Sequence, residues 1–560
     1  MEKLFLSEYP RPQLKRNSYI SLNGEWDFTI SKSEDIPSVF GKKIIVPFSP
    51  ESKVNHLIDV VSPEDWIFYK KEIKLEKGFL KDKLIIHFTA VDQIADVYFN
   101  DEHMIHHIGG FLPFDVVIDK SKVKDINVLI VKVKDLSDTS YLSRGKQKLD
   151  RGGIWYSPQS GIYLPVWMES VNEGYIKDIR LTPDIDNEVL NIKVISDSKD
   201  AIVIVENKEH LIKTNEDVSI KINELKLWSP EEPNLYGIKV KTDKDEISSY
   251  FAMRKFSTIN DGKHIRLALN NKPYFMKGVL DQGYYFDGGL TPNSYDDFEN
   301  DIKLVKELGF NTIRKHIKIE PLFWYYLCDK LGMIVWQDFV NGGEKYKFST
   351  IAFPLITGIH HKDNNYSKFA RNNLEGRKEA YQEFVDTISY LYNVPSIGLW
   401  TIFNEGWGQF DAKEIYKKLS NIDSTRLFDH ASGWHDQGVS DTKSLHVYFK
   451  RVKMPKQKHV KGRSIILSEC GGYHLKIDGH TFNDTNFGYK KMSSSEELVK
   501  TYKKFVDRDI LRNIPLGLSA FIYTQLSDVE DELNGFVTYD RKVVKVDTIK
   551  IKEINDKINL

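Results

Sequence analysis

The stretch Ile397-Gly-Leu-Trp-Thr-Ile-Phe-Asn-Glu-Gly-Trp-Gly-Gln409 decides how the second half of the chain is interpreted. It opens with an apolar run, β-branched and aromatic, which follows the turn sequence Asn393-Val-Pro-Ser396 and predicts a buried β-strand. The run leads into Asn404 and Glu405, an amide and a carboxylate at the point where the chain leaves the sheet. A single glutamate in this position is more often a solvated residue at a strand end than a catalytic group.

A second stretch has the same construction, because the apolar run Ser464-Ile-Ile-Leu-Ser468 is followed directly by Glu469. Two apolar strands that each end on a glutamate predict that two carboxylates converge on one end of a sheet. Glycoside hydrolysis requires such a pair, since one acid protonates the leaving oxygen while the other carboxylate attacks the sugar or activates water. Glu405 and Glu469 are therefore the candidate catalytic residues.

Length and composition limit the class of protein. A chain of 560 residues exceeds what a single hydrophobic core supports, so about two to four domains are expected. The net charge is −1, with 79 basic and 80 acidic residues intermixed, which argues against the basic face of a nucleic-acid-binding or membrane-binding protein. A carbohydrate substrate is the expected partner, and a homo-oligomer is compatible with the sequence.

The cysteines and the N-terminal segment predict a location in the cell. Cys328 and Cys470 are the only cysteines, which excludes a disulfide framework and favours reduced thiols in an intracellular protein. The first residues lack a signal-peptide pattern, and no apolar run is long enough to span a membrane, so a cytoplasmic protein is expected. Because no phosphate loop, dinucleotide fingerprint or metal-ligand spacing occurs, we expect neither a cofactor nor a metal ion.

The sequence of residues 1–257 predicts two all-β domains. Short alternating segments such as Trp26–Ile30 and Val128–Val133, separated by turn signals, predict a jelly-roll sandwich over residues 1–172. Residues 173–257 continue in the same way, with Ala201–Val205 as an example, and have the length of one immunoglobulin-like sandwich.

After residue 258 the pattern changes to strands alternating with helices, such as a helix over residues 295–308, which predicts a (β/α)₈ TIM barrel over residues 258–560. Glu405 then follows the fourth strand and Glu469 the seventh, so both lie on the C-terminal face where such barrels carry their active sites. The expected strands are Tyr274–Val279, Thr312–Lys315, Met333–Trp336, Ile397–Ile402, Leu427–His430, Ser444–Tyr448, Ser464–Leu467 and Leu518–Tyr523.

Residues 341–375 are too long for a plain barrel loop and are rich in aromatic residues, so we expect an ordered segment that walls the substrate cleft. The pair His360 and His361 within it has no third ligand at a recognisable spacing, and surface histidines are the simpler interpretation.

Four motifs, in this order along the chain, resemble glycoside hydrolase family 2, the family of β-galactosidases, β-glucuronidases and β-mannosidases. The first motif resembles the opening of the N-terminal domain of the family, and the second resembles its sugar-binding signature. The third resembles the end of its immunoglobulin-like domain, and the fourth resembles the second βα unit of its barrel. The motifs are Leu22-Asn-Gly-Glu-Trp-Asp-Phe28 (after Arg11-Pro12), Ile154-Trp-Tyr-Ser-Pro-Gln-Ser-Gly-Ile-Tyr-Leu-Pro-Val-Trp-Met-Glu169, Leu227-Trp-Ser-Pro-Glu-Glu-Pro-Asn-Leu-Tyr236 and Lys306-Glu-Leu-Gly-Phe-Asn-Thr-Ile-Arg314.

The resemblance implies a retaining exo-β-glycosidase in which Glu405 is the general acid/base and Glu469 the nucleophile. It also implies that Asn404 binds the sugar 2-hydroxyl and that Tyr448 contacts the nucleophile. Arg314 can hold the nucleophile carboxylate by hydrogen bonds. Apolar neighbours of Glu405 (Trp400, Phe403 and Trp407) are expected to raise its pKa.

Further residues at the strand ends are candidates for sugar contacts, although for most of them a role in barrel packing is about equally expected. The candidates are Asp281, Gln282, Arg314, His316, Trp336, Asp338, Trp434, His446, Tyr448, Tyr523 and Gln525.

The departures from the family pattern concern the sugar. Leu280-Asp281-Gln282 replaces the Asn-Arg-His sequence of many members, and the Asn-x-Lys motif that binds the glucuronide carboxylate is missing from the loops around residues 523–541. A neutral glycone, a β-galactoside first, is therefore expected, with β-glucuronide or β-mannoside as alternatives. Two other classes stay open: a non-catalytic carbohydrate-binding protein on the same scaffold, and a barrel enzyme of unrelated chemistry.

Overall fold

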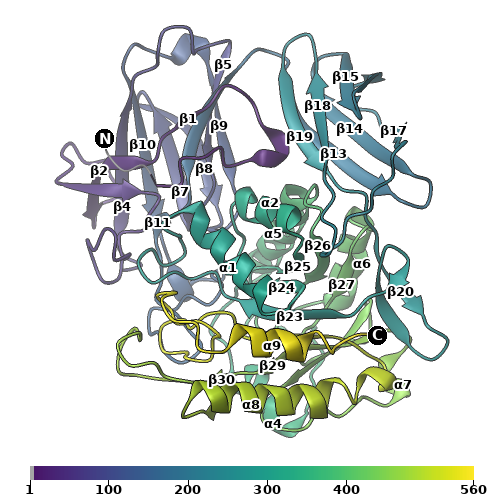
Figure 1. Ribbon diagram of the computed structural model, residues 1–560. Coiled ribbons are helices and arrows are strands. Elements are labelled where there is room, and N and C mark those ends of the chain that lie inside the picture. Colours follow the sequence, from purple (N-terminus) through teal and green to yellow (C-terminus); the bar gives the residue numbers. More distant parts are fainter. Residues whose placement is uncertain (1–4) are drawn as a thin grey trace.

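The structure is a computed structural model that describes residues 5–560. Two β-rich regions lie side by side above a barrel (Figure 1). The multidomain architecture and the C-terminal TIM barrel predicted from the sequence are confirmed, whereas the domain limits at residues 172 and 257 remain predictions. Within residues 5–560, none of the helices has the length and apolar character needed to cross a membrane.

The first region consists of two antiparallel sheets, with strand orders β1-β12-β5-β9 and β3-β2-β4-β10-β7-β8. Their facing sides bury alternate residues such as Phe28, Ile86 and Val131, which is the pattern expected when two sheets pack on one core. The strands are β1 (Ile20–Ser21), β2 (Gly24–Ser31), β3 (Lys42–Val46), β4 (Trp66–Ile73), β5 (Lys83–Phe88), β7 (Ile94–Phe99), β8 (Glu102–Ile108), β9 (Phe114–Asp119), β10 (Asn127–Lys134) and β12 (Val166–Val171), with a short pair of β6 (Val91–Asp92) and β11 (Gly161–Ile162).

The second region is a smaller sandwich, in which a three-stranded sheet (β13-β14-β17) faces a four-stranded sheet (β16-β15-β18-β19). Ile192, Val203 and Val240 are buried between the two sheets. The strands are β13 (Ile176–Asp184), β14 (Val189–Ser196), β15 (Asp200–Val205), β16 (Lys208–Lys213), β17 (Val218–Lys221), β18 (Tyr236–Lys241) and β19 (Glu246–Phe251).

The barrel is one sheet of eight parallel strands in the order β27-β26-β25-β24-β23-β32-β29-β28. It closes between β27 and β28, where the Asp441 N–H donates to the Phe428 carbonyl at 3.2 Å. Each strand overlaps one of the eight predicted from the sequence. They are β23 (Met276–Asp281), β24 (Thr312–Lys315), β25 (Ile334–Asp338), β26 (Ile397–Thr401), β27 (Leu427–Asp429), β28 (Thr442–Val447), β29 (Ser464–Gly471) and β32 (Leu518–Thr524).

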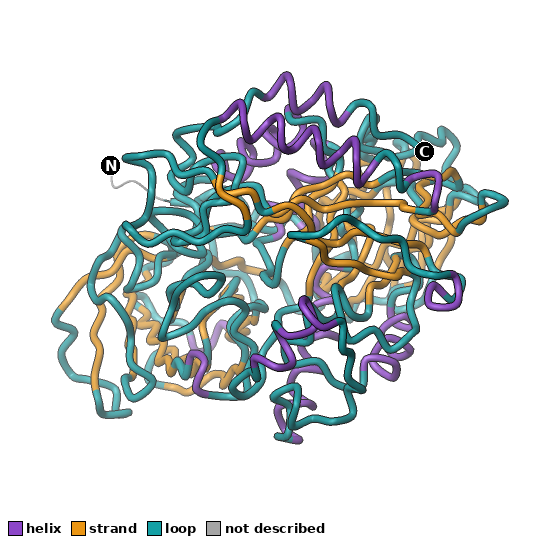
Figure 2. Tube along the Cα trace, turned by 90° about the horizontal axis from the view of Figure 1, so that it is seen from below, coloured by secondary structure: helices purple, strands orange, loops and turns teal. Residues whose placement is uncertain are grey.

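Helices lie outside the strands of the barrel (Figure 2). The first of them, α1 (Tyr295–Glu307), begins at a capping box in which Ser294 and Asp297 bond each other's backbone, and it buries Phe298, Ile302 and Val305 at helical spacing. The others are α2 (Leu322–Leu331), α5 (Leu374–Leu391), α6 (Ala412–Ile422), α7 (Gln457–Val460), α8 (Ser495–Phe505) and α9 (Thr548–Asn555).

A small antiparallel sheet of β20 (Phe256–Asn260), β21 (Ile265–Leu269) and β22 (Lys272–Pro273) precedes the barrel. Phe256 and Leu267 from this sheet belong to one buried cluster with Met276, Leu399 and Ile466 from the barrel strands. The interior of the barrel is therefore packed with apolar side chains, which leaves the opposite end of the strands for polar groups.

The long connection after β25 contains two short helices, α3 (Phe348–Ile351) and α4 (Phe353–Thr357), so the expectation of an ordered segment is met. It contacts the loop after β27, because the His361 N–H donates to Nδ1 of His435 at 3.0 Å and the His435 N–H donates to Nδ1 of His360 at 2.8 Å. His360 itself is exposed.

Candidate active site

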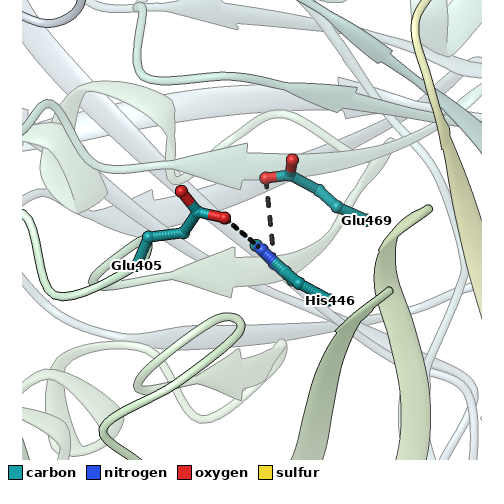
Figure 3. A group of neighbouring side chains, drawn as sticks. All are labelled: Glu405, His446 and Glu469. Carbon is teal, nitrogen blue, oxygen red and sulfur yellow. Dashed lines mark hydrogen bonds and ion pairs between the residues drawn. The ribbon is translucent and has the colours of Figure 1, made fainter. Parts of the chain in front are cut away.

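The barrel brings Glu405 and Glu469 together. One carboxylate oxygen of each lies, with a ring nitrogen of His446, in a group of atoms within 4.8 Å of one another. Figure 3 shows the two carboxylates on either side of the imidazole. Both glutamates are largely buried, with exposed fractions of 9% and 5%.

The backbone at the two glutamates differs from the sequence-based expectation in one respect. Glu405 follows β26 as predicted, and it has a φ of +52°, a left-handed conformation that costs a non-glycine residue energy and recurs at active sites. Glu469, in contrast, lies within β29 and not after its end. The prediction ended this strand too early because β29 continues to pair with β32 beyond an irregularity, through Cys470 and Tyr523.

Glu469 is held by two donors. Arg314 Nη1 lies 3.1 Å from its Oε1, and the Tyr448 hydroxyl donates to its Oε2 at 2.5 Å. Burial alone would raise the pKa of Glu469, but the positive charges of His446 and Arg314 outweigh it and lower the pKa to about 2. Glu469 is therefore an anion at neutral pH.

Glu405 lies in a different environment. His446 Nδ1 is 2.8 Å from its Oε1, and the Tyr448 hydroxyl is 3.4 Å from the same oxygen. Burial is the largest effect and raises the pKa of Glu405, and the negative charge of Glu469 acts in the same direction. The two carboxyl groups therefore have pKa values shifted in opposite directions, which is typical of an acid and a nucleophile that share one site.

Arg314 organises the residues behind Glu469. Its guanidinium donates to both carboxylate oxygens of Asp338 and, through Nη2, to Asn404 Oδ1 at 2.8 Å. Oδ2 of Asp338 also lies 2.7 Å from Nδ1 of His316. Burial lowers the pKa of His316 well below its usual value. Arg314, His316, Asp338 and Asn404 are thus brought together as the sequence predicted.

Two further predicted residues line the site beside Glu405. The indole N–H of Trp434 donates to the Glu405 carbonyl oxygen at 2.9 Å, and its ring meets His446 edge-on. His446 Nε2 lies 2.9 Å from the Ser432 hydroxyl.

The remaining predicted sugar contacts are placed differently. Asp281 pairs with the buried Lys315, and Gln282 donates to Gln525 Oε1 at 2.8 Å. Trp336 lies in the apolar interior of the barrel and donates its indole N–H to Met276, and Tyr523 is stacked on Phe536. Trp336 and Tyr523 therefore serve packing.

The apolar wall predicted around Glu405 is also only partly present. Trp400 donates its indole N–H to Asp423, and Phe403 packs against Phe384 of α5, so both face the helix layer. Only Trp407 lies on the side of the site, 6.0 Å from His316 between ring centroids.

Several residues near the site were not singled out by the sequence. Tyr489 stacks on Tyr448 with ring centroids 4.3 Å apart. Tyr156, from the first β-rich region, donates its hydroxyl to Glu532 at 2.5 Å, and Lys146 of the same region lies 5.1 Å from the Tyr156 ring centroid. Tyr156 falls within the motif Ile154–Glu169, but the sequence does not show that it meets Glu532 or that Tyr489 stacks on Tyr448, because both contacts depend on the fold.

Among residues 5–560, Glu405, His446 and Glu469 are the group with the geometry to hold a metal ion. Both ring nitrogens of His446 already have hydrogen-bonding neighbours, at Glu405 and Ser432, and Glu469 is paired with Arg314. The hydrogen bonds and the ion pair occupy the polar atoms of these residues without an ion. That the site binds no metal remains a prediction.

Comparison with known proteins places the chain in a family. The model described as glycosyl hydrolases family 2, TIM barrel domain, matches residues 260–546, and the model described as glycosyl hydrolases family 2 matches residues 174–254. Among solved structures, a β-D-glucuronidase for Dictyoglomus thermophilum has a TM-score of 0.77 at 18% identity and covers 98% of this chain and 99% of that one. A GH2 β-galacturonidase from Eisenbergiella tayi has a TM-score of 0.71 at 18% identity, with 98% of both chains covered.

Relatives by sequence carry two kinds of name. A β-galactosidase of Thermoanaerobacter pseudethanolicus is 24% identical over 64% of this chain and 47% of its own length, and a β-glucuronidase of Bacteroides fragilis is 22% identical over 94% of this chain and 80% of its own. The chain spans less than half the length of several such relatives. The family model for the barrel covers half of the chain and includes both glutamates, and the chain belongs to glycoside hydrolase family 2.

Proposed function

We propose that this chain is a retaining exo-β-glycosidase that hydrolyses terminal, non-reducing β-linked sugars, with Glu469 as nucleophile and Glu405 as general acid/base. The observation that carries the proposal is that one oxygen of each carboxylate lies within 4.8 Å of the other, with the two pKa values shifted in opposite directions. Retaining enzymes hold their carboxyl groups about 5–5.5 Å apart, whereas inverting enzymes need a wider gap for water.

In the first step, ionised Glu469 attacks the anomeric carbon while Glu405 donates its proton to the glycosidic oxygen. The bond between that carbon and oxygen breaks, the leaving group departs as an alcohol, and an ester joins the sugar to Glu469. Burial supports the proton on Glu405, and the hydrogen bonds from Arg314 and Tyr448 orient the attacking carboxylate.

In the second step, water replaces the sugar on Glu469. Esterification removes the negative charge of Glu469, which is one of the causes that raise the pKa of Glu405. Glu405 can then ionise, take a proton from water and let the oxygen attack the anomeric carbon, which frees Glu469 as a carboxylate. The two inversions give net retention.

Asn404 is suited to the sugar 2-hydroxyl. Its oxygen accepts from Arg314, whereas its buried Nδ2 has no hydrogen-bond partner among residues 5–560. A buried donor without a partner costs roughly 1–3 kcal/mol, so a substrate hydroxyl that accepts this bond would remove a penalty present in the free protein.

The proposal names three candidate sugars. The sequence favours a β-galactoside, with β-glucuronide and β-mannoside as alternatives, and the names of the relatives include both galactosidase and glucuronidase. A panel of 4-nitrophenyl β-glycosides, assayed for release of nitrophenol, ranks these sugars. Release from one of them would also rule out a purely sugar-binding protein.

The decisive test of the mechanism is the variant Glu469→Gly. It should lose activity on an aryl β-glycoside by several orders of magnitude, and added azide should partly restore turnover by filling the vacated space. The product should be the α-glycosyl azide, because azide then attacks from the face that Glu469 occupied. A β-glycosyl azide would assign the nucleophile role to another residue.

A further inference from the structure

A lysine of the first β-rich region reaches the catalytic end of the barrel. Lys146 lies in the segment between β10 and β11. This segment is bonded to the connection after β25, since the N–H groups of Arg144 and Gly145 donate to the Asn341 carbonyl at 3.0 and 3.1 Å. The position of Lys146 is therefore set by the barrel as well as by its own domain.

The Lys146 side chain is buried, yet its charge is unpaired. The residue is 6% exposed, and among residues 5–560 nothing forms a hydrogen bond or an ion pair with its ammonium group. Its nearest recorded neighbours are the rings of Tyr156 and Trp407, at 5.1 and 5.8 Å from their centroids. Cation–π attraction extends to about 6 Å, so these contacts are near its limit.

The ammonium group nevertheless lies beside the reacting residues. Burial is the largest cause that lowers the pKa of His316, and the charge of Lys146 is the second largest. The same charge acts to lower the pKa of Glu405, against the effect of burial. The nearby carboxylate of Glu532 is already occupied, because one oxygen accepts from the Tyr156 hydroxyl and the other from Asn534 Nδ2. The ammonium nitrogen is not fully enclosed, so solvent can reach it, and its unused donors are available to an acceptor on a ligand.

We propose that Lys146 is a specificity-determining residue that binds a carboxylate of the substrate, so that the preferred substrates are acidic β-glycosides. The proposal rests on the proposed function and runs against the sequence-based expectation of a neutral glycone. That expectation rests on the barrel loops around residues 523–541, whereas Lys146 belongs to the first β-rich region. The carboxylate belongs either to a uronic acid glycone or to the leaving group.

The test compares substrates that differ only in the carboxylate. The glycone pairs are 4-nitrophenyl β-glucuronide with β-glucoside, and 4-nitrophenyl β-galacturonide with β-galactoside. Lys146→Met should lower kcat/KM for the acidic member on the order of 10- to 100-fold, the usual worth of a charge-assisted hydrogen bond, and for the neutral member by less than about threefold. Lys146→Arg, which keeps the charge, should retain most of the preference.

The control variant is Lys148→Met, a half-buried lysine of the same segment whose loss removes the same charge. It should leave both ratios unchanged, and thermal melting of all variants checks that they fold. A second arm uses a carboxy-substituted nitrophenyl β-galactoside against the unsubstituted one. Dependence on Lys146 in this arm alone would place the carboxylate on the leaving group.

Equal losses for acidic and neutral substrates in every arm would overturn the proposal and leave Lys146 as an electrostatic neighbour of Glu405. Calorimetric titration with free glucuronate and galacturonate separates this failure from failure of the proposed function. If no aryl glycoside is hydrolysed but uronate binding still depends on Lys146, the glycosidase activity is wrong and the carboxylate site stands. Absence of both turnover and uronate binding overturns both.

Discussion

At the scale of single residues, Glu405 and Glu469 are chemically identical, and only their neighbours distinguish them. Glu469 lies beside His446 and Arg314 and accepts a hydrogen bond from the Tyr448 hydroxyl, and these neighbours lower its pKa despite burial. For Glu405, burial outweighs the hydrogen bond with His446 and raises its pKa. The surroundings therefore shift the free energy of ionisation in opposite directions at the two positions.

Glu405→Gln separates the acid from the nucleophile. The amide keeps the shape of the side chain but cannot supply a proton, so formation of the glycosyl-enzyme should depend on the leaving group. A dinitrophenyl glycoside should still esterify Glu469 at a substantial rate, whereas an alkyl glycoside should lose several orders of magnitude. Pre-steady-state phenol release and the intact mass of the trapped protein measure this. Equal losses for both substrates, with no trapped ester, would remove Glu405 from the acid/base role.

The pH dependence follows from the same pair. Activity requires ionised Glu469 and protonated Glu405. Because the first pKa is lowered and the second raised, kcat/KM should stay high over a broad window and fall on the acid side as Glu469 protonates and on the alkaline side as Glu405 ionises. In Glu405→Gln the alkaline fall should disappear while the acid fall remains. An alkaline limb that persists in this variant would mean that another group sets it.

At the scale of elements, β28 supports both glutamates. His446 lies within this strand and Tyr448 directly after it, two residues apart, so their side chains point to the same face. His446 contacts Glu405 and the Tyr448 hydroxyl donates to Glu469.

Tyr448→Phe tests this arrangement. It removes one hydrogen bond to the nucleophile but keeps the ring that stacks on Tyr489. We expect kcat for an aryl glycoside to fall roughly 10- to 100-fold, with the acid limb of the pH profile shifted upward because that hydrogen bond helps to lower the pKa of Glu469. Tyr489→Phe is the matched control. An unchanged acid limb in Tyr448→Phe would show that the hydroxyl does not act on Glu469.

At the scale of the whole molecule, one buried ion cluster connects the two β-rich regions. Arg16 pairs with Glu169 of β12 and with Asp245 of the turn between β18 and β19, at 2.8 and 2.9 Å. Burial alone would raise the pKa of Glu169, but Arg11, His87 and Arg16 lower it from 4.5 to about 2. The Glu169 side chain is fully buried, so solvent does not weaken these pairs.

This cluster predicts acid sensitivity. A carboxylate whose folded-state pKa is lowered contributes stability above its unfolded pKa and loses it as pH falls toward the folded value. For Glu169 the loss should be on the order of 3 kcal/mol, between about pH 5.5 and about pH 2. Glu169→Gln should have a lower melting temperature at pH 7, and the difference from the unsubstituted protein should shrink toward pH 3. A difference that is constant with pH would show that the Glu169 charge does not stabilise the fold.

The sequence by itself predicted the eight barrel strands, the convergence of the two glutamates and the residues around Glu469. Apolar runs bounded by turn signals mark buried strands, and parallel strands bring their carboxyl ends to one face. Glu405 and Arg314 could therefore be assigned to one site without coordinates. Trp336 and Tyr523 were assigned wrongly to that face for a physical reason: in a barrel both faces of a strand are buried, so the sequence does not distinguish the side chains that point inward, outward or into the site.

Only the tertiary structure decided what surrounds this face. Lys146 and Tyr156 belong to the loop between β10 and β11, and they meet the distant Glu532 because this loop lies against the barrel. No periodicity or spacing encodes such a meeting, since it depends on how two separately folded cores pack on each other. The positions of Glu405 and Glu469 are thus set by the barrel strands, whereas the charge of Lys146 reaches them only through the contact between domains.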